Sequence, residues 1–276
     1  MADRKPVVRS YGALEYASNA LRRHLGNLEP EHLTRERVRF YTAQRRAEGH
    51  TVGPAGAQRK KPTQDGTIIR ELLTLRAALK WAQREKWIDH IPHIEAPRQP
   101  PPRDRWLTRD EADRLLVGAN ALHIRVFLSL ALYTAARAGA ILDLTWDGID
   151  LATGLIDFGN VAGGKRRVVI PIADKLRPIL HEARDAATSR YVVEHGSMKV
   201  ASVKSGTRAA ARRAELPGVT PHILRHTGAT WMAMAGVPMD EIARLLGHGD
   251  SRITQRVFAK FSPEYLRNAV AALNGA

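Results

Sequence analysis

Five prolines fall within eleven residues of this 276-residue chain, at Pro92, at Pro97 and at Pro100 to Pro102. Proline has no backbone N–H to donate, and successive prolines favour an extended backbone over helix or sheet. Regular structure is therefore expected to stop here, and we read the segment as a strap between two domains. We expect a helical domain over residues 1–95, a basic linker over 96–107 and a larger domain over 108–276.

The first domain has helical periodicity. Helices are predicted over residues 11–25, 34–48 and 67–87, and the last of them carries leucine and isoleucine at helical spacing. Residues 51–66 are rich in glycine and proline, which predicts a loop.

The second domain combines helices and strands. Thr108 is followed three residues later by Glu111, the pattern of a helix-capping box, and residues 122–136 predict an apolar helix. Residues 155–158 and 167–171 flank a glycine-rich turn, which predicts a β-hairpin with a lysine at its tip. The expected fold class is mainly α with a small β-hairpin or sheet (α+β).

The chain carries 43 lysines and arginines against 28 acidic residues, a net charge of +15. Such a surplus indicates a polyanionic partner, and double-stranded DNA fits better than an anionic membrane because no single basic amphipathic helix dominates. A charge that serves only solubility is the plainer alternative. The candidate DNA contacts are basic residues of the loop, the third helix and the linker: Arg59, Lys60, Lys61, Arg70, Arg76, Lys80, Arg103 and Arg105.

Several classes of protein are excluded. The chain has no cysteine, which rules out disulfides, thiolate chemistry and cysteine-based zinc sites. The N-terminus lacks the apolar core of a signal peptide, and no run approaches the ~20 apolar residues that span a bilayer. We expect a cytoplasmic protein.

The stretch from Thr220 to Arg225 predicts a phosphate receptor. Pro221 suits the first position of a helix, and Thr220 suits its N-cap. His222 and Arg225 are three residues apart, so they share a helix face, and both are poor core residues. Unpaired N–H groups at the start of a helix attract an anion. A DNA-binding helix-turn-helix over residues 221–247 is the alternative.

A phosphate receptor becomes a catalyst when it binds the transition state of phosphoryl transfer more tightly than the diester. Catalysis also requires further cations, a proton donor and a nucleophile. Arg137, Lys165 and His248 are candidates. Each has a plainer interpretation as a helix cap, a solvated turn residue or a polar residue after a helix, but their joint occurrence is harder to dismiss.

Motifs in residues 108–262 resemble the tyrosine recombinase (phage integrase) family. They comprise an arginine, a lysine on a hairpin that ends in Val-Ile-Pro, a His-x-x-Arg pair and a Leu-Gly-His triplet, followed by an aromatic residue. In chain order the residues are Arg137, Lys165, His222, Arg225, His248 and Phe258. The first half is similar to the core-binding domain of that family. The resemblance implies a two-domain recombinase that acts as a tetramer on synapsed core sites, without ATP, metal or cofactor.

The resemblance also implies roles. Arg137 and Arg225 would clamp the non-bridging oxygens of the scissile phosphate. His222 and His248 would hydrogen-bond the phosphoryl oxygens and help to move protons, and Lys165 would protonate the 5′-hydroxyl leaving group. A tyrosine nine or ten residues after the second histidine would attack phosphorus and form a 3′-phosphotyrosyl link.

One departure from the family pattern concerns the nucleophile. Phe258 stands where relatives with the same Arg-Val-aromatic-Ala-Lys run have tyrosine, and phenylalanine has no hydroxyl. The chain is therefore expected to bind DNA without cleaving it, and an engineered substitution explains Phe258 better than a natural inactive copy. Tyr265, seven residues further on, is a poor substitute.

Two other departures concern supporting residues. Ala140 replaces the carboxylate that usually lies three residues after the first arginine, and we expect Asp143 to support that arginine instead. Lys165 lies six residues before Pro171, rather than about eight, which requires a shorter hairpin.

Three alternatives stay open. A non-catalytic DNA-binding regulator or accessory protein with a helix-turn-helix would share the basic charge. A type IB topoisomerase would share the chemistry, although chain length and the two-domain layout favour a recombinase. The apolar C-terminal segment, residues 265–276, suits either packing onto a neighbouring protomer or closure of its own domain.

Overall fold

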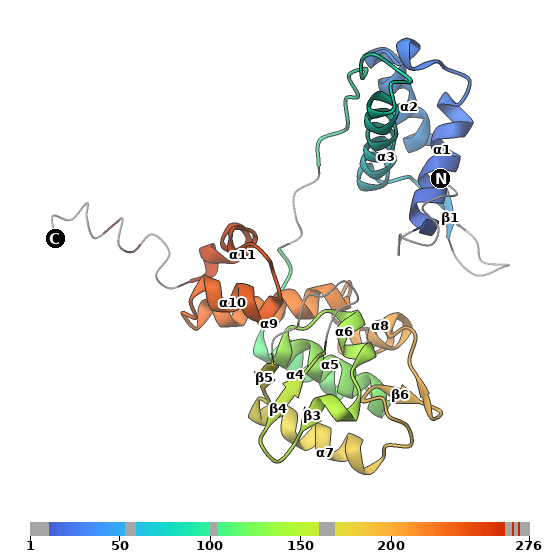
Figure 1. The fold of residues 1–276 in the computed structure, drawn as a ribbon. Coiled ribbons are helices and arrows are strands. Elements are labelled where there is room, and N and C mark those ends of the chain that lie inside the picture. The colour runs from blue at the N-terminus through green and yellow to red at the C-terminus, as the bar shows by residue number, and fades with distance from the viewer. Residues whose placement is uncertain are drawn as a thin grey trace. The chain divides into compact units, whose positions relative to one another are not determined.

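The computed structural model describes residues 11–52, 59–99, 104–159, 169–262, 267 and 270. The chain divides into two compact units, Met1–Arg103 and Asp104–Ala276 (Figure 1). The predicted hairpin tip with Lys165, the linker residues 100–103 and most of the segment after residue 262 lie outside the described residues.

The described part of the first unit, residues 11–52 and 59–99, contains three α-helices and one hairpin. Helices α1 (Tyr11–Leu25), α2 (Arg35–Glu48) and α3 (Asp65–Arg84) confirm the three predicted helices. A single turn of 3-10 helix, Pro30–His32, lies between α1 and α2.

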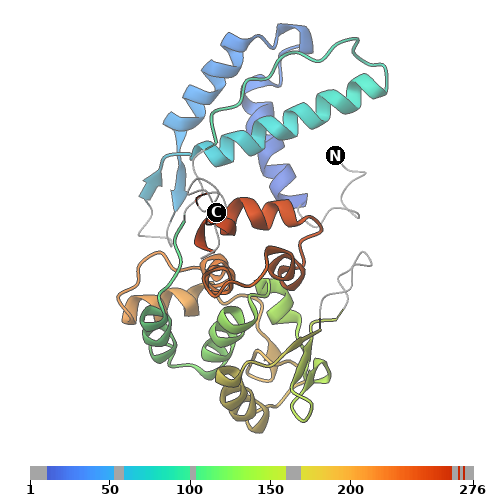
Figure 2. The same ribbon diagram turned by 90° about the vertical axis from the view of Figure 1, so that its left-hand side faces the viewer.

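The loop predicted over residues 51–66 is wrong at its edges. Strands β1 (His50–Val52) and β2 (Arg59–Lys61) pair antiparallel there, with Thr51 opposite Lys60. Figure 2 shows this hairpin where the chain passes from α2 to α3. The glycines and prolines of this segment predict a loop. The two strands have three residues each, which is too short for the alternation of polar and apolar residues that would predict a strand.

The core of the first unit encloses an ionic network. Glu71 is 1% exposed and accepts hydrogen bonds from Arg45, at 3.1 and 2.7 Å, and from the Tyr41 hydroxyl at 2.6 Å. A buried carboxylate is tolerated only when its oxygens are paired in this way. Burial, followed by the bond to Glu71, raises the pKa of Tyr41, so its hydroxyl stays protonated and donates.

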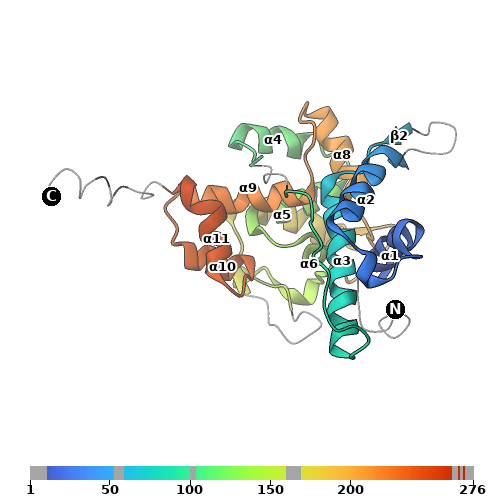
Figure 3. The same cartoon turned by 90° about the horizontal axis from the view of Figure 1, so that it is seen from above.

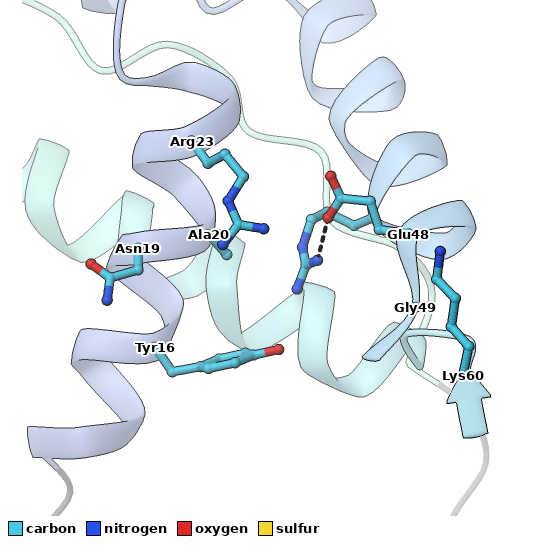
Figure 4. Close-up of a pocket in the computed structure, with 8 residues that line it drawn as sticks. Tyr16, Asn19, Ala20, Arg23, Glu48, Gly49 and Lys60 are labelled. Atoms are coloured by element: carbon cyan, nitrogen blue, oxygen red, sulfur yellow. Dashed lines mark hydrogen bonds and ion pairs between the residues drawn. The ribbon is translucent and has the colours of Figure 1, made fainter. Parts of the chain in front are cut away.

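A pocket of about 500 Å³ opens beside this network, between α1, α2 and β2 (Figure 4). Tyr16 and Arg23 of α1 line it together with Lys60 of β2. The ion pair between Arg45 and Glu48, at 2.7 Å, forms part of its wall.

The second unit is also mostly helical. Its helices are α4 (Arg109–Val117), α5 (Leu122–Thr134), α6 (Ala138–Asp143), α7 (Arg177–Asp185), α8 (Lys204–Arg213), α9 (Pro221–Met234), α10 (Met239–Leu246) and α11 (Ser251–Phe258). Short 3-10 turns occur at Trp146–Gly148, Asp174–Leu176 and Ala259–Phe261. The predicted capping box is confirmed, because Thr108 and Glu111 exchange side-chain to backbone bonds of 3.2 and 2.9 Å.

A three-stranded antiparallel sheet packs against the helices. Strands β3 (Ile149–Asp150), β4 (Leu155–Asp157) and β5 (Val169–Pro171) lie in that order, and Ile156 of β4 pairs with Ile170 of β5. Both isoleucines belong to the main core. A second small hairpin, β6 (Glu194–His195) with β7 (Met198–Lys199), was not predicted. The fold class is therefore as predicted, mainly helical with small antiparallel sheets.

The crossing of α5 and α9 positions the candidate site. A Cβ on Gly228 of α9 would lie 2.7 Å from the carbonyl oxygen of Leu132 and 3.0 Å from the Cβ of Ala135. Only glycine allows so close an approach of the two helices. Helices α10 and α11 lie beside α9 (Figure 3). No helix in the described part combines the length and the apolarity needed to cross a membrane.

Candidate active site

Helix α9 begins as the sequence predicts. Thr220 is its N-cap and accepts a hydrogen bond from the backbone N–H of Ile223 at 3.4 Å, and Pro221 is its first residue. His222 is exposed in the first turn, whereas Arg225, one turn later, is half-buried. The two side chains thus start from one face but lie in different surroundings.

Two carbonyl groups from distant helices hold the guanidinium of Arg225. Its Nη1 donates to the oxygen of Ala135 at 2.8 Å, and its Nη2 donates to the oxygen of Leu246 at 2.7 Å. Ala135 ends α5 in the left-handed conformation (φ 49°), and Leu246 is the last residue of α10. Carbonyls at helix C-termini carry partial negative charge, so they suit a cation.

Arg225 remains cationic in this position. Burial, and then the nearby charge of Arg137, lower its pKa to about 10. This value is still well above neutral pH, and the side chain therefore presents a rigid positive charge. Rigid cations of this kind bind a phosphoryl group without reorganisation.

His248 contacts the same arginine. Its Nε2 lies 3.3 Å from Nη2 of Arg225, and its Nδ1 lies 2.8 Å from the hydroxyl of Thr254. A guanidinium can only donate, so Nε2 is the acceptor and Nδ1–H donates to Thr254. Burial, followed by the charges of Arg225 and Arg137, lowers the pKa of His248, which fits this neutral imidazole.

Arg137 is the second cation of the group. It occupies the N-cap position of α6, is exposed, and donates to the carbonyl oxygen of Gly247 at 3.4 Å. The expected support from Asp143 is wrong, because that carboxylate pairs with Lys199 at 2.5 Å. Asp143 is the last residue of α6, whereas Arg137 precedes its first, so the helix separates them.

Phe258 is buried beside these residues. It is 5% exposed and packs in a small apolar cluster that includes Ala135 and Leu246, the two residues whose carbonyls hold Arg225. Its ring lies against the imidazole of His226, with 5.0 Å between the ring centroids and 38° between the planes.

Comparison with known proteins places this arrangement in a family. A profile of the phage integrase family matches residues 105–262. The chain belongs to this family. The tyrosine recombinase XerA of Thermococcus kodakarensis is 31% identical over 205 residues, which cover 71% of this chain and 72% of the relative. Members of the family are tyrosine recombinases, enzymes that cleave and rejoin DNA.

Two solved structures share the fold. A lambda integrase tetramer bound to a Holliday junction matches with a TM-score of 0.69 at 20% identity, and covers 91% of this chain and 74% of that one. A tyrosine-to-phenylalanine variant of the Tn1549 transposon integrase, in complex with transposon right end DNA, matches with a TM-score of 0.73 at 15% identity, and covers 99% and 96%.

The structure brings together the candidate site residues Arg137, Arg225 and His248, and Phe258 packs in the apolar cluster beside them. His222 lies one turn earlier on the exposed start of α9. Lys165 lies outside the described residues.

The candidate DNA contacts whose side chains the structure describes fall into two groups. Lys60, Lys61, Arg70 and Lys80 are exposed in the first unit. The other two described side chains are engaged within the protein. Arg76 donates to the carbonyl oxygen of Ile94, and Arg105 pairs with Glu111 at 2.7 Å. Arg103 and the side chain of Arg59 lie outside the described residues.

Sequence reasoning missed two residues of the site. Thr254 is fully buried and bonds His248, although it looks like an ordinary polar position of α11. His226 follows Arg225 directly and lies four positions after His222, so helical spacing would place it within reach of the same region. Its contact with Phe258 depends on how α9 and α11 pack, which no local pattern reveals.

Proposed function

We propose that this chain is a site-specific DNA recombinase whose cleavage step is blocked at Phe258, so that it binds a duplex core site and leaves it intact. The observation that carries the proposal is the contact between Arg225 and His248, which joins a fixed cation to a neutral imidazole acceptor. Phe258 packs in the cluster next to that pair.

The residues take the roles of the family's reaction. Arg137 and Arg225 bind the non-bridging oxygens of the scissile phosphate, and His222 donates a hydrogen bond to a phosphoryl oxygen. His248, whose Nε2 is a hydrogen-bond acceptor, helps to move protons. With a tyrosine at 258, its phenolic oxygen attacks phosphorus and the bond from phosphorus to the 5′ oxygen breaks. Lys165 gives that oxygen its proton, and a 3′-phosphotyrosyl link keeps the strand ready for rejoining.

The partners are double-stranded DNA and three further copies of the chain. The net charge of +15 suits a polyanion, and the exposed lysines 60, 61 and 80 with Arg70 offer phosphate contacts on the first unit. The fold is that of an integrase solved as a tetramer on a Holliday junction. Such a protein acts in the cytoplasm, where the host's DNA lies.

A helix-turn-helix regulator is the second candidate. In that case the polar side chains of α9 would face a DNA groove. Arg225 instead donates to the backbone of α5 and α10 inside the unit, and this favours the recombinase.

The proposal is tested by restoring the missing hydroxyl. The Phe258→Tyr chain is incubated with a pool of nicked duplexes that carry a randomised core, and covalent protein–DNA adducts are separated on a denaturing gel. We expect an adduct that maps to the peptide containing residue 258. The unsubstituted chain is the matched control, and should retard the same duplexes without forming an adduct. Absence of any adduct with Phe258→Tyr, despite DNA binding, would contradict the catalytic assignment.

A further inference from the structure

His226 has a buried nitrogen without a hydrogen-bond partner. The ring of His226 lies against Phe258, and its Nε2 is buried and unpaired among the described residues. An unpaired buried polar atom lowers the stability of the fold, so such an atom marks a place where a hydrogen-bond partner is needed. The roles proposed for Arg225 and His248 do not use this nitrogen.

Thr230 adds a second polar atom of the same kind. Its hydroxyl is buried and has no hydrogen-bond partner in the described part of the chain, and it lies one helical turn after His226 on α9. The neighbouring Ala229 and Ala233 pack in one apolar cluster with Phe258. Tyrosine at 258 would add a hydroxyl to a ring that is only 5% exposed, and a buried phenol needs a hydrogen-bond partner. His226 is the polar group already in contact with that ring.

The surroundings of His226 favour the neutral imidazole. Burial is the main cause of its lowered pKa, and the electrostatic effects of His222 on α9 and of Lys260 on the 3-10 turn after α11 act in the same direction. The carboxylate of Asp104 opposes them, but it is itself paired with Lys260. At neutral pH the imidazole therefore has a lone pair available to accept a hydrogen bond.

We propose that His226 accepts the hydrogen bond of the tyrosine hydroxyl at position 258 in the active recombinase, and takes its proton during attack. The inference rests on the proposed function, since it requires residue 258 to be the nucleophile position. The phenolic O–H proton moves to Nε2 as the bond between that oxygen and phosphorus forms. The bond from phosphorus to the 5′ oxygen breaks, and the 5′ oxygen receives a proton from a separate acid, the role assigned above to Lys165.

The hydrogen bond can be measured without DNA. Full-length chains labelled with ¹⁵N-histidine, with Phe258 and with Phe258→Tyr, are compared by long-range ¹H–¹⁵N correlation spectra near neutral pH. The His226 signals are identified by their loss in His226→Gln. We expect the Nε2 signal of His226 to shift on Phe258→Tyr as that atom accepts a hydrogen bond. An unchanged Nε2 signal, or an Nε2 that carries a proton, would overturn the proposal whether or not the enzyme cleaves DNA.

Single-turnover cleavage tests the proton transfer. In the Phe258→Tyr background, His226→Phe should slow adduct formation by about 10²-fold or more, the usual contribution of a general base. His226→Gln keeps an acceptor near the same place but cannot take the proton. The cleavage rate of His226→Gln should lie between the rates of the Phe258→Tyr chain and of His226→Phe. It should also continue to rise with pH in the range where the rate of the Phe258→Tyr chain no longer changes.

Thr230→Val is the matched control, because it removes the other unpaired polar atom on the same side of α9. It should cleave at the rate of the Phe258→Tyr chain. Equal cleavage by His226→Phe and Phe258→Tyr, with equal DNA binding and thermal stability, would overturn the role of His226. So would a large loss in Thr230→Val alone, which would identify Thr230 as the acceptor.

Discussion

Arg225 and His248 lie 3.3 Å apart, from Nη2 to Nε2, although 23 residues separate them in the chain. Because the guanidinium can only donate, this contact fixes the imidazole with its lone pair on Nε2. The opposite ring nitrogen is then fixed as a donor to Thr254. Arg225 therefore sets the tautomer of the histidine, and Thr254, which accepts from Nδ1–H, holds its orientation.

Replacing Thr254 by valine should slow cleavage. The change removes the acceptor for Nδ1–H of His248 and keeps the size of the side chain. In the Phe258→Tyr background we expect adduct formation to slow by about 10–100-fold, the loss found when the partner that orients a functional histidine is removed from a metal site. Quenched-flow measurement of adduct formation on a nicked duplex gives the rate.

Two variants control for that experiment. Thr254→Ser keeps the hydroxyl and should cleave nearly as fast as the Phe258→Tyr chain. Thr207→Val changes a threonine of α8 that is also buried and whose hydroxyl has no partner among the residues that the structure describes. If Thr254→Val and Thr207→Val cleave at the same rate, Thr254 does not orient His248.

Protonation of three partly buried histidines should reduce stability in mild acid. Burial is the main cause of the lowered pKa of His123, His226 and His248. A neutral histidine is then favoured in the folded state, whereas the unfolded chain takes up protons near pH 6.5. The stabilisation that each neutral histidine contributes is thus fully present above about pH 6.5. As the pH drops toward the lower pKa of the folded state, the free energy of unfolding falls by at most about 1.4 kcal/mol for each histidine and each pH unit.

Urea-induced unfolding at a series of pH values between about 5 and 8 measures this loss. Ordinary carboxylates titrate near pH 4 and contribute little in that window. His248→Gln removes one titrating group and should flatten the curve. A free energy of unfolding that rises on acidification through this window would show that the histidines do not behave as described.

The sequence predicts local features of the fold well because short-range chemistry determines them. Gly26 follows the last residue of α1, as expected for a residue that ends a helix. Thr220 and Pro221 mark the start of α9, and the box of Thr108 and Glu111 marks the start of α4. In contrast, the pairing of β1 with β2 depends on a contact between residues too far apart for periodicity to report.

The sequence predicts which residues form the candidate site, but it does not predict the contacts that these residues make. The charges of Arg137 and Arg225 and the imidazole of His248 are conspicuous in the sequence. The groups that hold these side chains in place cannot be seen in the sequence, because Arg225 binds backbone carbonyls rather than an acidic side chain. The expected role of Asp143 fails because that carboxylate pairs with Lys199 of β7, a contact between distant parts of the chain that no local spacing reports.

Arg225 should stabilise the second unit as well as bind phosphate. Arg225→Lys keeps the charge, but an ammonium lacks the fork that reaches the carbonyls of Ala135 and Leu246 together. We expect the free energy of unfolding to fall by about 2 kcal/mol, since hydrogen bonds of charged groups contribute roughly 1.5–3 kcal/mol each. Urea-induced unfolding followed by circular dichroism measures it.

Arg137→Lys is the matched control for this change. The side chain of Arg137 is exposed and makes one long contact of 3.4 Å. Its replacement should leave the unfolding curve where it was while slowing cleavage in the Phe258→Tyr background. Equal destabilisation by both substitutions would mean that the two carbonyl contacts do not anchor Arg225.

The buried pair in the first unit should be the most sensitive point of that unit. Glu71→Gln removes the charge that balances Arg45, which is 3% exposed, and leaves Tyr41 and Arg45 with a poorer acceptor. Removing one partner of a buried ion pair costs about 3–5 kcal/mol. Hydrogen exchange followed by mass spectrometry should show lost protection in peptides from α2 and α3, with peptides of the second unit unchanged.

The control is Glu95→Gln, which breaks the exposed pair with Arg39 and should leave protection as it was. Similar exchange in the two variants would contradict a stabilising role for the buried pair.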